Sequence, residues 1–268
     1  MRWNWQQSDW PFFRYDDSRI DDIEKRFLLD AGFMFGVFAH LQADDRQRLT
    51  VELISSEALK TSAIEGEHLN SDSLQSSIRR QLGLDADNRQ ISPAERGIAE
   101  MMIDLYRDFA SPLSHTLLTG WHGMVTNGRQ DLSDQGRYRT HPQPMQIVSG
   151  AIYAPKVHFE APPSLQVPAE MERFIHWFND TAPKGHSPLP VLQRAAIAHL
   201  YFESIHPFED GNGRIGRAIA EKALAQGVGQ PTLIALAYTI ERDKKSYYSA
   251  LEQANKHNEI TDWLVYFA

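Results

Sequence analysis

The stretch His206-Pro207-Phe208-Glu209-Asp210-Gly211-Asn212-Gly213-Arg214-Ile215-Gly216-Arg217 decides both the local fold and the chemistry that this chain can support. Twelve consecutive residues combine a histidine, acidic side chains, two glycines around an asparagine, and two arginines. Such a set offers a proton acceptor, a ligand for a hard cation, accessible backbone amides and two permanent positive charges.

The residues on either side of this stretch predict a helix–loop–helix corner. Residues 192–205 are rich in Ala and Leu, contain no Gly or Pro, and place apolar side chains at helical spacing. Pro207 ends this helix, because proline lacks an amide donor and disfavours a helical residue before it. Residues 215–226 predict a second helix that stops at Gly227.

The start of the second helix is a predicted anion site. Gly211, Asn212 and Gly213 lie there, where the first amides of a helix have no internal partner and the helix dipole is positive. Arg214 and Arg217 are three residues apart, so they share a helix face and can both bind phosphate oxygens.

Three further side chains complete the predicted corner. Asp210, beside the glycines, is suited to Mg²⁺ when phosphates and water supply the other ligands. His206 is suited to proton transfer near neutral pH. Phe208 has no chemistry to contribute and is expected to anchor the loop in the core.

The whole stretch resembles the signature of Fic-domain proteins, HxFx(D/E)GNGRxxR, with every defined position filled. The resemblance implies transfer of AMP from ATP to a Ser, Thr or Tyr hydroxyl of a target protein. It implies that His206 is the base, that Asp210 binds Mg²⁺ between the α- and β-phosphates, and that residues 211–213 form the anion hole. Arg214 would contact the phosphates, and Arg217 the γ-phosphate.

A second motif lies upstream and suggests regulation. Residues 50–65 predict an amphipathic helix, in which Thr61 and Glu65 are surface neighbours and Gly66 ends the helix. An ordinary solvated Glu65 is the plainer interpretation. Thr61-Ser62-Ala63-Ile64-Glu65-Gly66 also resembles the Fic inhibitory motif, (S/T)xxxE(G/N). This implies a class II, self-inhibited arrangement in which Glu65 pairs with Arg217 and takes the space of the γ-phosphate.

Residues 145–159 predict a small β-hairpin, because short apolar runs surround Ser149-Gly150. An irregular surface loop is the alternative. In Fic proteins a hairpin flap at this position registers the target by strand addition. The resemblance makes Ile147, Val148 and Tyr153 the expected contacts with the target.

The segment from Arg242 to Asn255 predicts a helix with a pair of tyrosines at its start. Core packing would be the common role of such a pair. YYxxLxxAN also resembles the Fic segment that holds adenine. This implies that Tyr248 and Leu251 stack on the base and that Asn255 bonds to its edge.

Composition and charge limit the other classes of function. The chain has 268 residues, a net charge of −8 and no cysteine. The charge disfavours nucleic acid and anionic membrane as partners, and the absence of cysteine excludes disulfides and cysteine-bound metals. We see no membrane-spanning run and no signal-peptide pattern, so a cytoplasmic protein is the default expectation.

The expected fold is mainly α, a Fic-type helical bundle with a small hairpin flap and an N-terminal helical domain. We place the N-terminal domain at residues 1–88 and the core at 89–268, with the active-site loop at 206–217. Residues 3–15 are dense in aromatics and are expected to form a packing cluster; they also resemble the opening of an extension found on some bacterial Fic proteins. Further helices are predicted at residues 18–41, 73–82, 93–109, 116–127 and 171–179.

Several alternatives share these residues. The same site could remove AMP from a modified protein, with Glu65 positioning a water molecule, or transfer another phosphate-containing group. A non-catalytic interaction or regulatory protein is the third alternative, which the intact His206 and Asp210 oppose. The expected partners are ATP as substrate, Mg²⁺, a target protein with a reactive hydroxyl, and a second copy of the chain in a homodimer.

Overall fold

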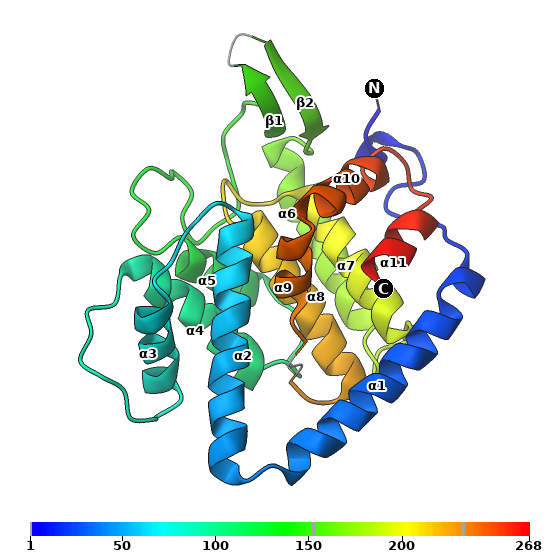
Figure 1. Cartoon of the computed structure of the whole chain (residues 1–268). Helices are drawn as coiled ribbons and strands as arrows, with labels where there is room; N and C mark the ends of the chain where they lie inside the picture. Colours follow the sequence, from blue (N-terminus) through cyan, green and yellow to red (C-terminus); the bar gives the residue numbers. More distant parts are fainter. Residues whose placement is uncertain (1, 152–153, 232–233) are drawn as a thin grey trace.

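The computed structural model describes residues 2–151, 154–231 and 234–268, and it is a bundle of α-helices with one antiparallel hairpin (Figure 1). The helices are α1 (Asp21–His40), α2 (Ala43–Ile64), α3 (Ser71–Gln81), α4 (Pro93–Arg107), α5 (His115–Val125), α6 (Val167–Asp180), α7 (Val191–Ile205), α8 (Asn212–Val228), α9 (Leu236–Arg242), α10 (Lys244–Ala254) and α11 (Thr261–Phe267). Strands β1 (Gln146–Ala151) and β2 (Ala154–Glu160) form the hairpin. The prediction of a mainly α fold with a hairpin flap and N-terminal helices is confirmed.

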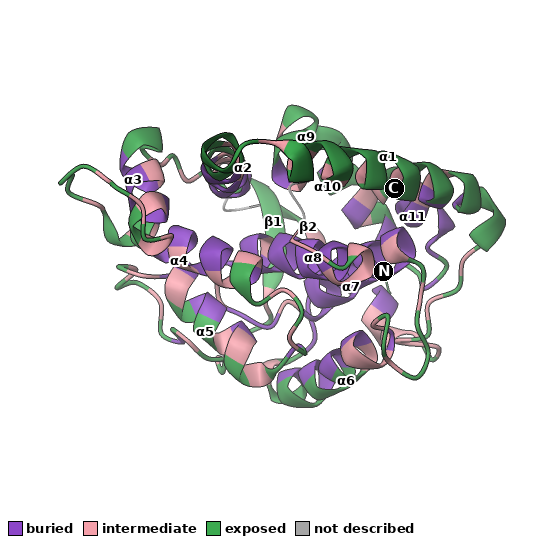
Figure 2. Ribbon diagram, turned by 90° about the horizontal axis from the view of Figure 1, so that it is seen from below, coloured by how far each residue is buried: buried purple, intermediate pink, exposed green. Residues whose placement is uncertain are grey.

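Helices α7 and α8 form the centre of the bundle. Every residue of α7 from Leu192 to Ile205 is buried, as a helix that is largely apolar on all sides should be. Figure 2 shows both helices as almost entirely buried, with the other helices around them. The corner between α7 and α8 is therefore held from both sides by a packed core.

Two helix boundaries differ from the sequence prediction. Gly227 does not end α8; it packs against Val191, and the helix ends instead at Gly229, which has a φ of 78°. The predicted helix at 242–255 is two helices, because Asp243 interrupts it and accepts a hydrogen bond from the Ser246 amide at 3.2 Å. An Asp side chain that caps an amide in this way starts a new helix.

The first two helices differ in how they meet the bundle. On α2, Val51, Ile54 and Ala58 are buried in the main core. Helix α1 runs obliquely across the molecule and meets α2 only at its C-terminal end (Figure 1). Its outer face carries Leu29 and Phe33, which are 76% and 71% exposed.

The two ends of the chain lie together. Arg14 pairs with Glu259 in an isolated parallel bridge, and Asn258 Nδ2 donates to Asn4 O at 3.3 Å. In α11, Trp263 is buried and its Nε1 donates to Ala196 O of α7 at 2.9 Å. Within the three described ranges, no helix combines the length and the apolar character needed to cross a membrane.

Candidate active site

The corner between α7 and α8 has a strained histidine at its centre. His206 follows the last residue of α7 and has φ 49° and ψ 60°, a left-handed conformation that is uncommon for residues other than glycine. The buried Arg139 supports it, because its Nε donates to His206 O at 2.9 Å and its backbone N donates to Pro207 O at 3.0 Å. Arg139 was not identified from the sequence.

Phe208 anchors the loop, as expected. It is fully buried and stacks on His122, with ring centroids 4.2 Å apart and planes 8° apart. Asn212 closes the loop around it, since its Oδ1 accepts from Phe208 N at 2.9 Å and its Nδ2 donates to Phe208 O at 2.8 Å. The Asn212 side chain is therefore committed to the loop, and only its backbone amide is left for an anion.

The amides of residues 211–213 begin α8. Gly211 is its N-cap, with a φ of 81° that disfavours any side chain. A Cβ at Gly213 would lie 2.2 Å from Glu65 Oε1, so only glycine leaves room for that carboxylate. The predicted anion site at this helix end thus already has the Glu65 carboxylate beside it.

Arg217 is the residue that Glu65 contacts. Its Nη2 donates to Glu65 Oε1 at 2.8 Å and to Thr61 O at 2.9 Å, and its Nε donates to Thr61 Oγ1 at 2.7 Å. Burial alone would lower the pKa of Arg217, but the Glu65 carboxylate raises it above its usual range. The structure therefore brings together the three residues that the sequence linked. Gly66, with a φ of 82°, is the residue directly after Glu65.

Arg214 has a carboxylate partner that the sequence did not suggest. Its Nη1 donates to Glu67 Oε2 at 2.5 Å. The Arg214 side chain is 5% exposed and that of Glu67 is 34% exposed, so the pair is only partly screened by water. Glu67 lies two residues beyond the motif that contains Glu65, so the motif gave no signal for it.

Asp210 also has a partner from elsewhere in the chain. Arg129 Nη1 donates to Asp210 Oδ2 at 2.6 Å, and Gly211 N donates to Oδ1 at 2.5 Å. Burial pushes the pKa of Asp210 upward, but the bonds from Arg129 and Gly211 and the nearby Arg214 hold it below its usual range. The carboxylate is thus ionised at neutral pH. In the described ranges, no three His, Cys, Asp or Glu side chains cluster in a way that could hold a metal ion.

A cavity of about 770 Å³ opens over the corner. Glu203, His206, Glu65 and Gly213 line one part of it. The flap and the segment of α10 with its C-cap form the other walls, through Ile147, Val148, Ser149, His158, Phe159, Lys245, Tyr247, Tyr248, Ser249, Leu251, Glu252 and Asn255. A volume of this size lies within the range of small-molecule sites. The expected adenine residues, the flap residues Ile147 and Val148, and Gly213 of the expected phosphate site therefore line one cavity. The other expected phosphate residues, Gly211, Asn212, Arg214 and Arg217, are not among its lining residues, and Tyr153 lies outside the described residues.

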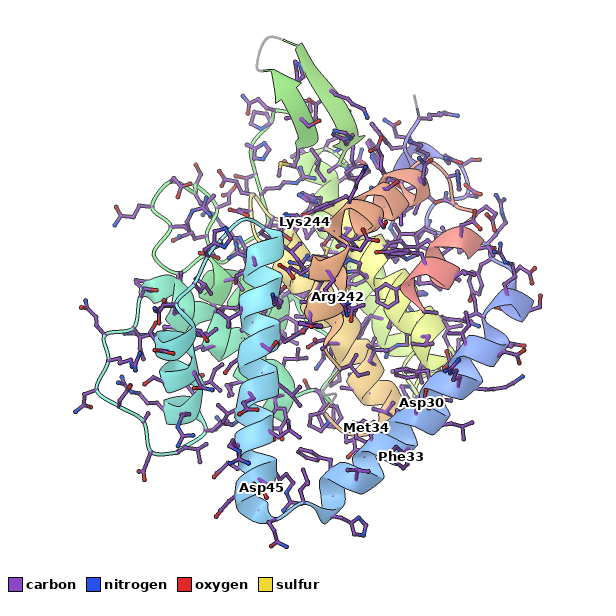
Figure 3. All side chains as sticks on the ribbon, in the orientation of Figure 1. Asp30, Phe33, Met34, Asp45, Arg242 and Lys244 are labelled. Atoms are coloured by element: carbon purple, nitrogen blue, oxygen red, sulfur yellow. The ribbon has the colours of Figure 1, made fainter. Side chains whose placement is uncertain are left out.

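The two tyrosines of α10 have different environments. Tyr247 is buried, and its hydroxyl is 2.7 Å from His199 Nε2. Tyr248 is 42% exposed and faces the cavity, with its hydroxyl 3.4 Å from Ile64 O at the end of α2. Lys244 also donates to Ile64 O, and Figure 3 places it beside this end of α2. The predicted adenine wall and the helix that carries Glu65 are thus in direct contact.

Two titratable groups next to the cavity have pKa values displaced by burial. Burial lowers the pKa of His206 to about 4, and the charge of Arg139 contributes. Burial also raises the pKa of Glu203 to about 8, and the charge of Glu65 contributes. At neutral pH His206 is uncharged and can accept a proton, whereas Glu203, 3.8 Å from His206 Nδ1, is protonated.

The flap is tied to α10 by a relay of three side chains. Ser149 Oγ lies 2.5 Å from His158 Nε2, and His158 Nδ1 lies 2.8 Å from Glu252 Oε2. In the hairpin the register shifts between Ile147 and Val148, so the strand bends where it faces the cavity.

Comparison with known proteins finds two family matches along the chain. Residues 112–224 match the model of the Fic/DOC family, and residues 3–84 match a domain of unknown function, DUF4172. A probable protein adenylyltransferase of Aquifex aeolicus is 30% identical over 110 residues, which are 41% of this chain and 29% of that protein. The protein adenylyltransferase Fic of Nematostella vectensis is 32% identical over 102 residues, which are 38% of this chain and 22% of that protein. The matched stretch is less than a third of each relative.

Solved structures share the fold. A Fic-domain-containing signaling protein from Bacteroides thetaiotaomicron superposes with a TM-score of 0.64 at 19% identity, and the match covers 90% of both chains. A Fic family protein from Desulfovibrio desulfuricans gives a TM-score of 0.63 at 22% identity over 91% of this chain and 70% of that one. The fold is therefore the Fic fold, with the residues that match the Fic/DOC family following those that match DUF4172.

Proposed function

We propose that this chain transfers AMP from ATP to a hydroxyl side chain of a target protein, and that its own N-terminal domain inhibits the reaction. The observation that carries the proposal is the position of Glu65, which holds Arg217 and lies against Gly213 at the start of α8. That helix end is where the amides and the helix dipole favour a phosphate. The names of the curated relatives, which are protein adenylyltransferases, support the same activity.

The cavity and the start of α8 beside it together offer the groups that ATP requires. The amides of residues 211–213, with Arg214 and Arg217, would bind the phosphates, and Tyr248, Leu251 and Asn255 would hold the adenine. Asn255 Oδ1 already accepts from Ser204 Oγ at 3.2 Å, so its amide nitrogen is the group left for the base.

Asp210 would hold Mg²⁺, which supplies positive charge to the phosphates when it is bound. A single ionised carboxylate suits a cation whose other ligands are phosphate oxygens and water. The bond from Arg129 Nη1 to Asp210 would have to open when the cation binds.

The chemistry then needs one proton acceptor and an aligned phosphate. The target hydroxyl oxygen attacks the α-phosphorus, the bond from that phosphorus to the bridging oxygen breaks, and pyrophosphate leaves. The uncharged His206 accepts the hydroxyl proton. The helix amides and the arginines stabilise the charge that develops on the phosphates, which is the main source of rate enhancement in such reactions.

In this proposal Glu65 inhibits by competing with the γ-phosphate for Arg217. Both are anions, so the two cannot share one buried guanidinium without repulsion. ATP could still enter, but with its α-phosphate displaced from the line of attack. This corresponds to the class II arrangement that the inhibitory motif suggested.

Labelled ATP tests the proposal directly. Glu65→Gly should raise AMP incorporation into proteins of a lysate from the source cells by about a hundredfold, because misalignment of about 1 Å costs that much. Glu52→Gln, an exposed carboxylate on the same helix, is the matched control and should behave as wild type. His206→Ala added to Glu65→Gly should abolish incorporation. Equal incorporation by wild type and Glu65→Gly would disprove the inhibition.

Removal of AMP from a modified target is the second candidate, because Glu65 and His206 line one cavity and could together activate a water molecule. AMP-labelled lysate proteins from the experiment above provide the substrate. Loss of label with wild type but not with Glu65→Gly would favour this reaction, whereas stable label with both proteins would exclude it.

A further inference from the structure

The first residues of the chain lie next to the proposed active site. Asn4 is fully buried, and its Nδ2 donates to Ser204 Oγ at 2.8 Å. Ser204 is two residues before His206 in α7. The backbone N of Asn4 donates to Asn255 O at 2.7 Å, at the end of α10. A single asparagine thus joins the helix that ends at the catalytic histidine to the helix that forms the adenine wall.

The residues on either side of Asn4 contact the base of the flap. Trp3 packs edge-on against Phe159, with ring centroids 5.4 Å apart and planes at 72°. Trp5 Nε1 donates to Glu160 O at 2.7 Å. Phe159 is buried on β2 and lines the cavity. The flap therefore rests on two tryptophans from a segment more than 150 residues away in the sequence.

We propose that the segment from Trp3 to Gln6 is a positioning segment for the transfer reaction. It holds the end of α7, the end of α10 and the base of the flap in one arrangement without touching the reactants. A displacement of about 1 Å in such a site lowers the reaction rate about a hundredfold. A segment that contacts three walls of the cavity therefore affects how well ATP and the target are aligned. The inference rests on the proposed function.

The same N-terminal domain then has two opposite effects. Trp3, Asn4 and Trp5 complete the site, whereas Glu65 blocks it. This assigns a role in the reaction to the opening of the DUF4172 domain, which the aromatic cluster predicted from the sequence did not suggest. Relief of inhibition has to move Glu65 while leaving residues 3–6 in place.

Two pairs of substitutions in the Glu65→Gly background test this. Trp5→Phe and Trp10→Phe each remove one indole N–H; that of Trp10 donates to Glu170 of α6 at 3.0 Å, away from the cavity. Asn4→Ala has Phe12→Ala as its control, because Phe12 lies nearby in the sequence and is 76% exposed. The rate of labelled AMP incorporation into lysate proteins is measured against ATP concentration, together with the Tm of each variant.

We expect Asn4→Ala to raise the KM for ATP and lower kcat, each by about tenfold. Trp5→Phe should lower kcat about fivefold with the KM for ATP unchanged, because it releases only the flap. Neither control should change kcat or KM. If Trp5→Phe matches Trp10→Phe in kcat, or if each loss of activity merely follows the fall in Tm, the segment is only structural and the proposal fails.

Amide hydrogen exchange separates this proposal from the proposed function. Asn4→Ala should speed exchange in residues 244–255, and Trp5→Phe in 154–160, relative to the two controls. If the Glu65→Gly protein transfers no AMP, the proposed function fails. The exchange measurement still tests whether residues 3–6 hold α10 and the flap in place. Unchanged exchange in these segments would overturn the positioning role.

Discussion

Both arginines of the corner, and Asp210, already have a partner of opposite charge. Arg217 is held by Glu65, and Arg214 by Glu67. Because the two carboxylates lie two residues apart after α2, one movement of that helix end would free both arginines. Under the proposed function, Glu67 is a second group that ATP has to displace.

The substitution Glu67→Gln tests this at the level of a single residue. In the Glu65→Gly background it should tighten ATP binding about threefold to tenfold, since a partly exposed ion pair is of modest strength. Titration calorimetry with ATP measures the Kd, and Glu52→Gln is the control. An unchanged Kd would show that Arg214 binds phosphate as well with Glu67 beside it.

Glu203 should make stability depend on pH. Burial raises its pKa from 4.5 in the unfolded chain to about 8. The neutral carboxyl therefore makes its full contribution to the free energy of unfolding below pH 4.5. That contribution is lost as the pH rises through about 8.

The substitution Glu203→Gln removes this dependence. From about pH 4.5 to about pH 9, the free energy of unfolding of the variant should rise relative to wild type by up to about 5 kcal/mol. Urea unfolding across this range measures the difference. A constant difference between the two proteins would show that Glu203 is ionised in the folded state.

The residues of the corner could be predicted from the sequence because they are contiguous, so one run of twelve residues contains the histidine, the carboxylate and both arginines. The partners of these charged side chains could not be predicted in this way. Arg129 is 81 residues from Asp210, and Glu67 is 147 residues from Arg214. Such pairs depend on how distant segments pack, and an exposed arginine or glutamate on its own carries no signal of its partner.

At the scale of elements, the sequence was informative where a helix has an apolar face or a cap. Helix α4 begins at Pro93, the residue where the sequence predicted it to begin, and Ser92 caps it by accepting from Glu95 N at 3.3 Å. Helix α2 begins seven residues before the expected Thr50. Residues 43–49 are mostly polar and have no buried side chain, so they give no helical periodicity of apolar residues.

The role of the flap in docking the target can be tested at this scale. Ile147 and Val148 are 42% and 51% exposed on β1, which suits an apolar target strand. Replacing both with serine in the Glu65→Gly protein should lower AMP incorporation into lysate proteins about tenfold. The Kd for ATP should not change. Incorporation at the parent rate would mean that the target docks elsewhere.

At the scale of the whole molecule, packing is uneven. Helices α7 and α8 are buried on all sides, whereas α1 exposes its outer face (Figure 2). Helices with few buried contacts open locally at low free-energy cost.

Amide hydrogen exchange should therefore be much faster in α1 than in α7. Residues 28–40 of α1 should exchange at least about a hundredfold faster than residues 195–204 of α7. Mass spectrometry of peptic fragments measures both segments in one sample. Equal protection would imply that another surface covers α1 in solution.

The contact between the two ends of the chain affects how the protein is made. Residues 3–6 leave the ribosome well before Asn255 and Asn258, to which Asn4 bonds, because these are synthesised about 250 residues later. During translation the flap and the end of α10 therefore lack their support, whereas α2, with Glu65, has long been synthesised. Under the proposed function, a nascent chain would thus pass from an incomplete site directly to an inhibited one, without an interval in which it modifies the proteins around it.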